Sequence, residues 1–137
     1  MQLPLLKPDA YQAEGTAAVP GAPALLGAEC DACGYVFFPA QMFGCERCGA
    51  HGALLKPRAL AGRGTLTAAA AVHLHPGKRP LPFVVGTVRL LDGPSVRTLL
   101  AEGSERLAPG QLMRTMLAPT PDSETGETKL DLRFAPE

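Results

Sequence analysis

Two Cys-x-x-Cys-Gly motifs constrain the fold of this chain more than any other feature of its sequence. They span residues 30–34 and 45–49, and they contain every cysteine of the 137-residue chain: Cys30, Cys33, Cys45 and Cys48. A Cys-x-x-Cys turn places two sulfurs on one side of a tight loop, and the following glycine lets the chain fold back beneath a bound metal. Two facing turns build a tetrahedral site of four thiolates, which suits zinc and in some proteins iron.

Two disulfide bonds are the competing interpretation of the same cysteines. No secretory signal pattern precedes them, and four cysteines in 137 residues is a low density for a disulfide scaffold. We therefore predict one metal centre rather than two disulfides.

Composition excludes some classes of function. Thirteen Lys and Arg residues balance thirteen Asp and Glu residues, so net charge gives no electrostatic reason to bind nucleic acid. No apolar run approaches the roughly 20 residues of a membrane span. Both observations lead us to expect a soluble protein in a reducing, cytoplasmic setting.

We divide the chain into an N-terminal arm at 1–26, a ribbon at 27–57 and a barrel domain at 58–137. Prolines in the arm leave room for at most a short helix around residues 10–18. Two interpretations of the arm stay open: a loosely ordered terminus, or a segment that orders on a partner. The second is suggested by apolar side chains without an obvious core, namely Leu3, Leu5, Leu6 and Tyr11.

The ribbon contains four of the chain's seven aromatic residues, Tyr35, Phe37, Phe38 and Phe43. A short β-prone run at 35–39 ends at a proline between the two cysteine motifs. We expect the four rings to cover the metal site and to pack it on the next domain. An exposed surface for a partner is the alternative.

The remaining chain has the pattern of a small β-barrel. Strands are predicted at 62–75, 81–91, 95–100, 111–117 and 129–134, with a turn at Asp92-Gly93-Pro94. Gly86 is expected to mark a bulge or bend inside the second strand, and a short helical turn is expected at 102–107. Five strands with these features predict an OB-fold barrel. The predicted fold is thus mainly β, with an arm, a rubredoxin-like zinc ribbon and a five-stranded barrel.

Ordered motifs along residues 25–136 resemble a known family. They are the two Cys-x-x-Cys-Gly turns, Phe38-Pro39, Gly62-Arg63-Gly64-Thr65, the stretch from Pro82 to Gly93, and Phe134-Ala135-Pro136. The chain is similar to the zinc-ribbon/OB-fold family long catalogued as a domain of unknown function and associated with acyl-CoA enzymes. It departs from that pattern in lacking a tryptophan before the barrel and in carrying alanines at 68–71.

The resemblance implies a partner role. Members of the family are similar to small subunits that assemble with thiolase-fold catalytic subunits, including thiolases and lipid-transfer-protein-like aldolases. There they brace the large subunit and help shape the acyl-CoA path. The implied role is a non-catalytic zinc-binding accessory subunit in a hetero-oligomer, and coenzyme A is a ligand that the complex would share.

The residues themselves offer no catalyst. Thiolase-type chemistry needs an activated cysteine, and none is left if all four hold metal. Zinc closed by four thiolates has no open position for substrate, so its role is structural. His51 follows the second motif and is expected at the surface. Candidate contacts to the phosphates of CoA are Arg63, His73, His75, Lys78 and Arg79, with a solvated loop as the alternative.

Two other functions remain as alternatives. A nucleic-acid-binding module would need basic residues interleaved with stacking aromatics. Residues 64–75 and 81–91 hold only Phe83 as an aromatic and Arg89 as a base, which argues against it. An iron-containing electron carrier would use the same four thiolates, but it gives the attached barrel no purpose.

Overall fold

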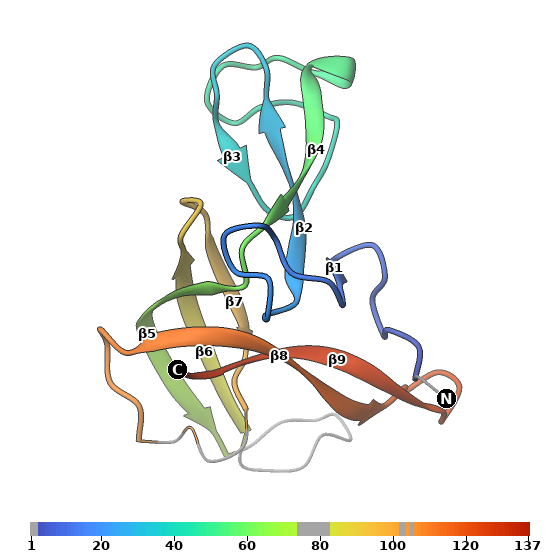
Figure 1. Ribbon diagram of the computed structural model, residues 1–137, viewed down its shortest axis with the longest axis vertical. Coiled ribbons are helices and arrows are strands. Elements are labelled where there is room, and N and C mark those ends of the chain that lie inside the picture. Colours follow the sequence, from blue (N-terminus) through green and yellow to red (C-terminus); the bar gives the residue numbers. More distant parts are fainter. Residues whose placement is uncertain (1–2, 74–82, 102–103, 105) are drawn as a thin grey trace.

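The computed structural model describes residues 3–73, 83–101, 104 and 106–137. It consists almost entirely of β-strands, arranged as a narrow ribbon sheet above a strongly curled barrel sheet (Figure 1). The predicted fold class is therefore confirmed. Among the described residues no helix has the length and apolar character needed to cross a membrane.

The ribbon sheet is built around one central strand, β2. Its elements are β1 (Tyr11–Gln12), β2 (Ala24–Cys30), β3 (Val36–Phe37), the 3₁₀ turn η1 (Gly52–Leu54) and β4 (Leu55–Leu60). Strand β2 pairs antiparallel with the other three strands. A Cβ atom on Gly27 would lie 2.7 Å from the Leu60 side chain and 2.5 Å from the Phe37 carbonyl oxygen. Only glycine therefore lets the ribbon strands approach so closely at this point.

Strand β4 crosses the boundary at residue 57 that separates the predicted ribbon from the predicted barrel. It pairs with β2 from Leu55 to Leu60, so its whole length belongs to the ribbon sheet. The division into three parts remains a prediction.

The barrel consists of five antiparallel strands. They are β5 (Arg63–Val72), β6 (Phe83–Leu90), β7 (Ser95–Leu99), β8 (Leu112–Pro121) and β9 (Thr128–Pro136), in the spatial order β7-β6-β5-β8-β9. Leu100 forms a parallel bridge with Phe134, and the Ala101 N–H donates to the Phe134 carbonyl oxygen at 2.8 Å. This bridge joins the two outer strands of the sheet and closes it in the way typical of an OB fold.

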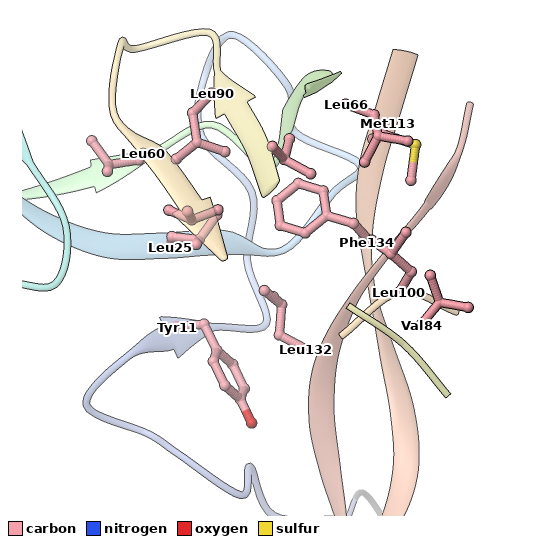
Figure 2. Close-up of a cluster of buried hydrophobic side chains, with 12 residues drawn as sticks. Tyr11, Leu25, Leu60, Leu66, Val84, Leu90, Leu100, Met113, Leu132 and Phe134 are labelled. Atoms are coloured by element: carbon pink, nitrogen blue, oxygen red, sulfur yellow. The ribbon is translucent and has the colours of Figure 1, made fainter. Parts of the chain in front are cut away.

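One hydrophobic core is shared by the arm, the ribbon and the barrel. Phe134 is fully buried, and Figure 2 shows its ring in the middle of the cluster. Leu66, Val88 and Met113 contribute from the barrel, while Leu25 enters from the ribbon and Tyr11 from the arm. The two lobes therefore depend on each other for burial of apolar surface.

The arm packs on its own barrel, and the short helix allowed around residues 10–18 is not formed. The Tyr11 side chain is only 3% exposed, and the segment around it pairs as β1 with β2. Leu5 bridges Leu130, and the backbone of Leu6 bonds to the same residue at 2.8 Å. Pairing with existing strands satisfies this backbone better than an isolated helical turn between prolines.

Gly86 does not form the bulge predicted inside the second strand. It pairs regularly with Ala69 and Thr98, and the register shift lies on the facing strand, between Leu66 and Ala68. A Cβ atom on Gly86 would lie 2.9–3.0 Å from the side chains of Leu100 and Leu66. The glycine is thus required by crowding inside the barrel, not by a change of strand direction. The helical turn predicted at 102–107 falls partly outside the described residues.

A carboxylate clamps the ribbon to the barrel. Asp92 lies in the turn between β6 and β7, where it accepts bonds from the Arg58 guanidinium and the Ala61 N–H, both at 2.8 Å. Arg58 also contacts Glu29 at 3.3 Å. Nearby, the Thr115 hydroxyl donates to the Pro23 carbonyl oxygen at 2.6 Å. These bonds fix the orientation of β4 as it leads into β5.

Candidate metal centre

The two cysteine turns have the same backbone geometry. In each turn the glycine N–H donates to the carbonyl oxygen of the first cysteine, at 2.7 Å for Gly34 and 2.8 Å for Gly49. Both glycines have a φ of 80°, a conformation that side chains disfavour. The N–H of each first cysteine also bonds to a carbonyl oxygen five residues ahead. Each Cys-x-x-Cys-Gly sequence therefore encodes the same turn.

The turns bring all four thiols together. The Sγ atoms of Cys30 and Cys48 are 3.6 Å apart, as are those of Cys33 and Cys45, and all four lie within 4.8 Å of one another. A tetrahedral zinc with Zn–S bonds of about 2.3 Å requires sulfurs about 3.8 Å apart. The four side chains are positioned to bind one metal ion of this kind. All four cysteines are free, so neither disulfide of the competing interpretation is present.

The crowded sulfurs perturb one another's acidity. Burial raises the pKa of Cys45, but backbone N–H groups and neighbouring thiols that bond its thiolate outweigh this and lower it to about 7. A backbone N–H favours the Cys48 thiolate, yet desolvation and the three neighbouring thiols raise its pKa to about 12. Four thiolates in this space therefore need a cation to offset their mutual repulsion.

The ribbon encloses the site unevenly. Cys30 and Cys45 are buried with Ala28, Phe37 and Leu55 in a small core of their own, whereas Cys48 is exposed. A closed four-thiolate site at this place offers no position for a substrate. It can stabilise the ribbon but cannot act as a Lewis acid.

Three of the four ribbon aromatics behave as expected. Tyr35 stacks on Phe37 with ring centroids 6.0 Å apart beside the cysteines, and Phe38 packs against the shared core. Phe43 is the exception, because its side chain is 95% exposed. Gln41 holds the turn there by accepting the Phe43 N–H at 2.6 Å and donating to the Gly44 carbonyl oxygen at 2.7 Å. This turn directs the ring into solvent instead of over the metal site.

The structure does not bring the described CoA candidates together. Arg63 opens β5, and His73 lies just beyond its other end, about 30 Å away for an extended strand. Arg63 also pairs with Glu137 at 2.8 Å, while His73 and His51 are exposed. His75, Lys78 and Arg79 lie outside the described residues. Contact between CoA and these side chains remains a prediction.

Sequence reasoning missed a cavity of about 340 Å³ between the arm, the ribbon and the barrel. Its wall includes Tyr11, Leu25 and Phe38, with the exposed cations Lys7 and Arg97. A further lining residue is the buried Asp131, whose carboxylate is already bonded by Tyr11 and Arg133. No local motif signals this cavity, because its lining comes from segments far apart in the sequence.

Comparison with solved structures shows the fold in a second protein. A chain of the structure described as "Ltp2-ChsH2(DUF35) aldolase" aligns with a TM-score of 0.64 and 22% identity, over 82% of this chain and 84% of that one. A protein of unknown function from the DUF35 family of Sulfolobus solfataricus aligns with a TM-score of 0.49 and 13% identity, over 80% of this chain and 75% of that one. No protein-family model and no curated protein sequence matches the chain. The likeness to the aldolase chain establishes a shared fold.

Proposed function

We propose that this chain is a non-catalytic accessory subunit that binds zinc and braces the catalytic subunit of an acyl-CoA-processing complex. The observation that carries the proposal is the convergence of all four cysteines on one centre. It leaves no thiol to act as the nucleophile of thiolase-type chemistry. The reacting cysteine or base must then come from a second protein, either a thiolase or a thiolase-like aldolase.

Zinc fits the donor set better than a metal that prefers oxygen ligands. Bound by four thiolates, it supplies folding free energy to the ribbon. How far this stabilisation extends depends on how the ribbon is attached to the rest of the chain. Through β2 and β4 the ribbon is continuous with the shared core, and the bonds of Asp92 hold it at a fixed angle to the barrel. The metal therefore supports a surface that includes both lobes.

The structural neighbour supports a partnered role. That structure is described as an Ltp2-ChsH2(DUF35) aldolase, and the matching chain shares this fold over most of the length of both chains. We infer that the present chain likewise works in a hetero-oligomer and that CoA binds near the junction of the two subunits. Arg63, His73, His75, Lys78 and Arg79 are our candidates for contacts to its phosphates.

Co-purification from the native host with metal analysis tests the proposal. We expect about one zinc per chain, as four thiolates require, and a thiolase-fold protein that elutes with it. Acyl-CoA turnover should need both proteins. Turnover by this chain alone would contradict the proposal, as would iron in the site without any partner.

A double substitution tests the CoA contacts separately. Lys78→Ala with Arg79→Ala should raise the apparent KM of the complex for acyl-CoA, because two charges that attract phosphate are removed. Unchanged kinetics would remove these residues from the site and leave the accessory role intact.

A further inference from the structure

Four arginines lie on the outer face of the barrel, one on each of four adjacent strands. They are Arg114 on β8, Arg63 on β5, Arg89 on β6 and Arg97 on β7. On each strand the residues next to the arginine face the core. Val88 and Leu90 flank Arg89, Val96 precedes Arg97, and Met113 precedes Arg114. Arg63 is followed by the buried Gly64, and Leu66 on the same face of that strand belongs to the core. Because successive side chains of a strand point to opposite faces, all four arginines point outward.

Strand register makes the four arginines neighbours. Arg63 is directly opposite Arg114 on the adjacent strand. Arg89 is opposite Thr65 and Ser95, which places it diagonally beside Arg63 on one side and Arg97 on the other. Direct and diagonal neighbours in a sheet lie about 5 and 7–8 Å apart. The arginines thus form one continuous row across the sheet.

Internal carboxylates compensate little of this charge. Glu137 pairs with Arg63 at 2.8 Å. Among the described residues, no carboxylate lies within ion-pair distance of Arg89, Arg97 or Arg114, whereas Arg58 and Arg133 elsewhere in the chain are paired. Like charges directly opposite in a sheet are destabilising. Folding alone does not explain why Arg63 and Arg114 face each other.

Exposed leucines flank the row. Leu91 is 59% exposed, and its N–H bonds to the Arg63 carbonyl oxygen at 3.0 Å; Leu112 is 48% exposed and lies opposite Thr65. Arginines beside apolar side chains are typical of the centre of a protein–protein interface. We call this surface the arginine face, consisting of Arg63, Arg89, Arg97, Arg114, Leu91 and Leu112.

We propose that the arginine face binds an acidic surface of a protein partner. The arginines can form ion pairs with carboxylates of a partner. The exposed leucines can pack against apolar side chains, which a nucleic acid backbone does not supply. Recognition of single-stranded nucleic acid would need aromatic rings for base stacking. Phe83, on the same strand as Arg89, is six residues and about 20 Å away from it. The identity of the partner as a thiolase-fold subunit rests on the proposed function; the choice of surface does not.

Charge reversal in the assembled complex tests the inference. The double variant Arg89→Glu/Arg97→Glu changes the row, while the matched control Lys56→Glu/Arg106→Glu reverses two exposed cations outside it, one of them on the ribbon strand β4. The partner that co-purifies with the wild-type chain is identified by mass spectrometry. Its dissociation constant is then measured for each variant at 50 and 300 mM salt, and cross-links map where it binds.

We expect the Arg89/Arg97 variant to bind the partner at least tenfold more weakly at 50 mM salt, with a smaller salt dependence than the wild type. The control should change affinity less than threefold, and cross-links should join acidic peptides of the partner to the arginine face. Zinc content and the thermal midpoint should match the wild type. If the glutamate variant does not fold, Arg89→Gln/Arg97→Gln makes the same comparison with a smaller loss.

Other results would overturn the inference in distinguishable ways. Equal affinity of the variant and the wild type would reject the surface and leave the accessory role standing. Equal weakening by the control would reduce the effect to overall charge. Binding of a single-stranded oligonucleotide that is lost on reversal, without any protein partner, would replace both proposals with nucleic-acid recognition. A wild-type chain that retains no partner would reject both.

Discussion

Tyr11 offers a quantitative test of how the arm joins the core. Its ring is buried in the shared cluster, and Figure 2 shows its hydroxyl directed away from Phe134. The hydroxyl donates to the Leu130 carbonyl oxygen at 2.9 Å or the Asp131 carboxylate at 3.2 Å, and it accepts the Lys7 N–H at 3.1 Å. Tyr11→Phe removes these bonds while keeping the ring.

The loss of stability in Tyr11→Phe depends on which hydrogen bonds the former partners of the hydroxyl keep. Leu130 still accepts from the Leu6 N–H, Asp131 still accepts from the Leu132 N–H, and the exposed Lys7 can turn its N–H to water. No buried group is left wholly unsatisfied, so Tyr11→Phe should cost about 1–2 kcal/mol of unfolding free energy. For a chain of this length that lowers Tm by about 4–8 °C. Tyr11→Ala also empties the ring's place in the core and should cost about 3–5 kcal/mol.

The assay is urea denaturation with zinc present, with both variants beside the wild type. The m-value should stay constant, so that the shift in midpoint reports stability. If Tyr11→Phe is as stable as the wild type, or as unstable as Tyr11→Ala, the assignment of separate roles to the hydroxyl and the ring is refuted.

The wild type and Tyr11→Phe should also differ in how their stability, measured by urea denaturation, changes at alkaline pH. The pKa of Tyr11 is raised, chiefly because burial disfavours the phenolate and further because the Asp131 carboxylate lies beside it. The folded protein therefore keeps this proton to higher pH than the unfolded chain, whose tyrosine titrates near pH 10. Its contribution is present below about pH 10 and is lost as the pH rises through the folded-state pKa. Tyr11→Phe should lack this part of the alkaline loss of stability.

Three further changes probe the ribbon and the barrel. Cys30→Ser removes a buried ligand and should reduce bound zinc, measured by atomic absorption, to near zero and release the catalytic partner; full activity of a metal-free variant would exclude the bracing role. Lowering the pH should release zinc to a chromogenic chelator because protons compete for the thiolates, and metal retained at pH 4 would contradict a four-thiolate site. Gly86→Ala should cost about 1–3 kcal/mol through overpacking against Leu66 and Leu100, whereas the control Gly21→Ala, with open space around its Cβ position, should change stability by less than about 0.5 kcal/mol.

The metal centre was predictable because its information is local. Each Cys-x-x-Cys-Gly turn is specified by five consecutive residues, and the requirement for glycine at the end of the turn is visible in the sequence. β-prone runs separated by turn sequences similarly predicted the strands of the barrel, and the last of them, at 129–134, alternates between apolar and polar residues. Nothing in these patterns reported what Gly86 faces, since Leu66 and Leu100 reach it only after the sheet curls.

The arginine row and the packing of the arm could not be predicted, because they depend on strand register between segments far apart in the sequence. A count along two strands finds Arg89 as their only base, yet pairing places it beside arginines from β5 and β7. The arm misled for a related reason. Tyr11 has no apolar partner near it in the sequence, because its partners on β2 and β9 lie at least 13 residues away. Phe43 was assigned to the metal site from proximity alone, and the hydrogen bonds of Gln41 decide otherwise.

The two cysteine turns have matching hydrogen bonds and form locally. The segment between them therefore has a different role, which is to link the turns. Each turn is complete as a local structure, and β3 (Val36–Phe37) is paired with β2, so residues 39–44 act as the tether that sets the effective concentration of one thiolate pair near the other. Closure entropy changes slowly with tether length, by about 0.6 kcal/mol for each doubling. The tip that carries Phe43 can therefore gain residues, or exchange them, at a small cost in metal affinity. A change of either glycine would instead disturb the turn itself. The ribbon thus separates two turns whose geometry is fixed by glycine from a tip that tolerates changes of length and sequence.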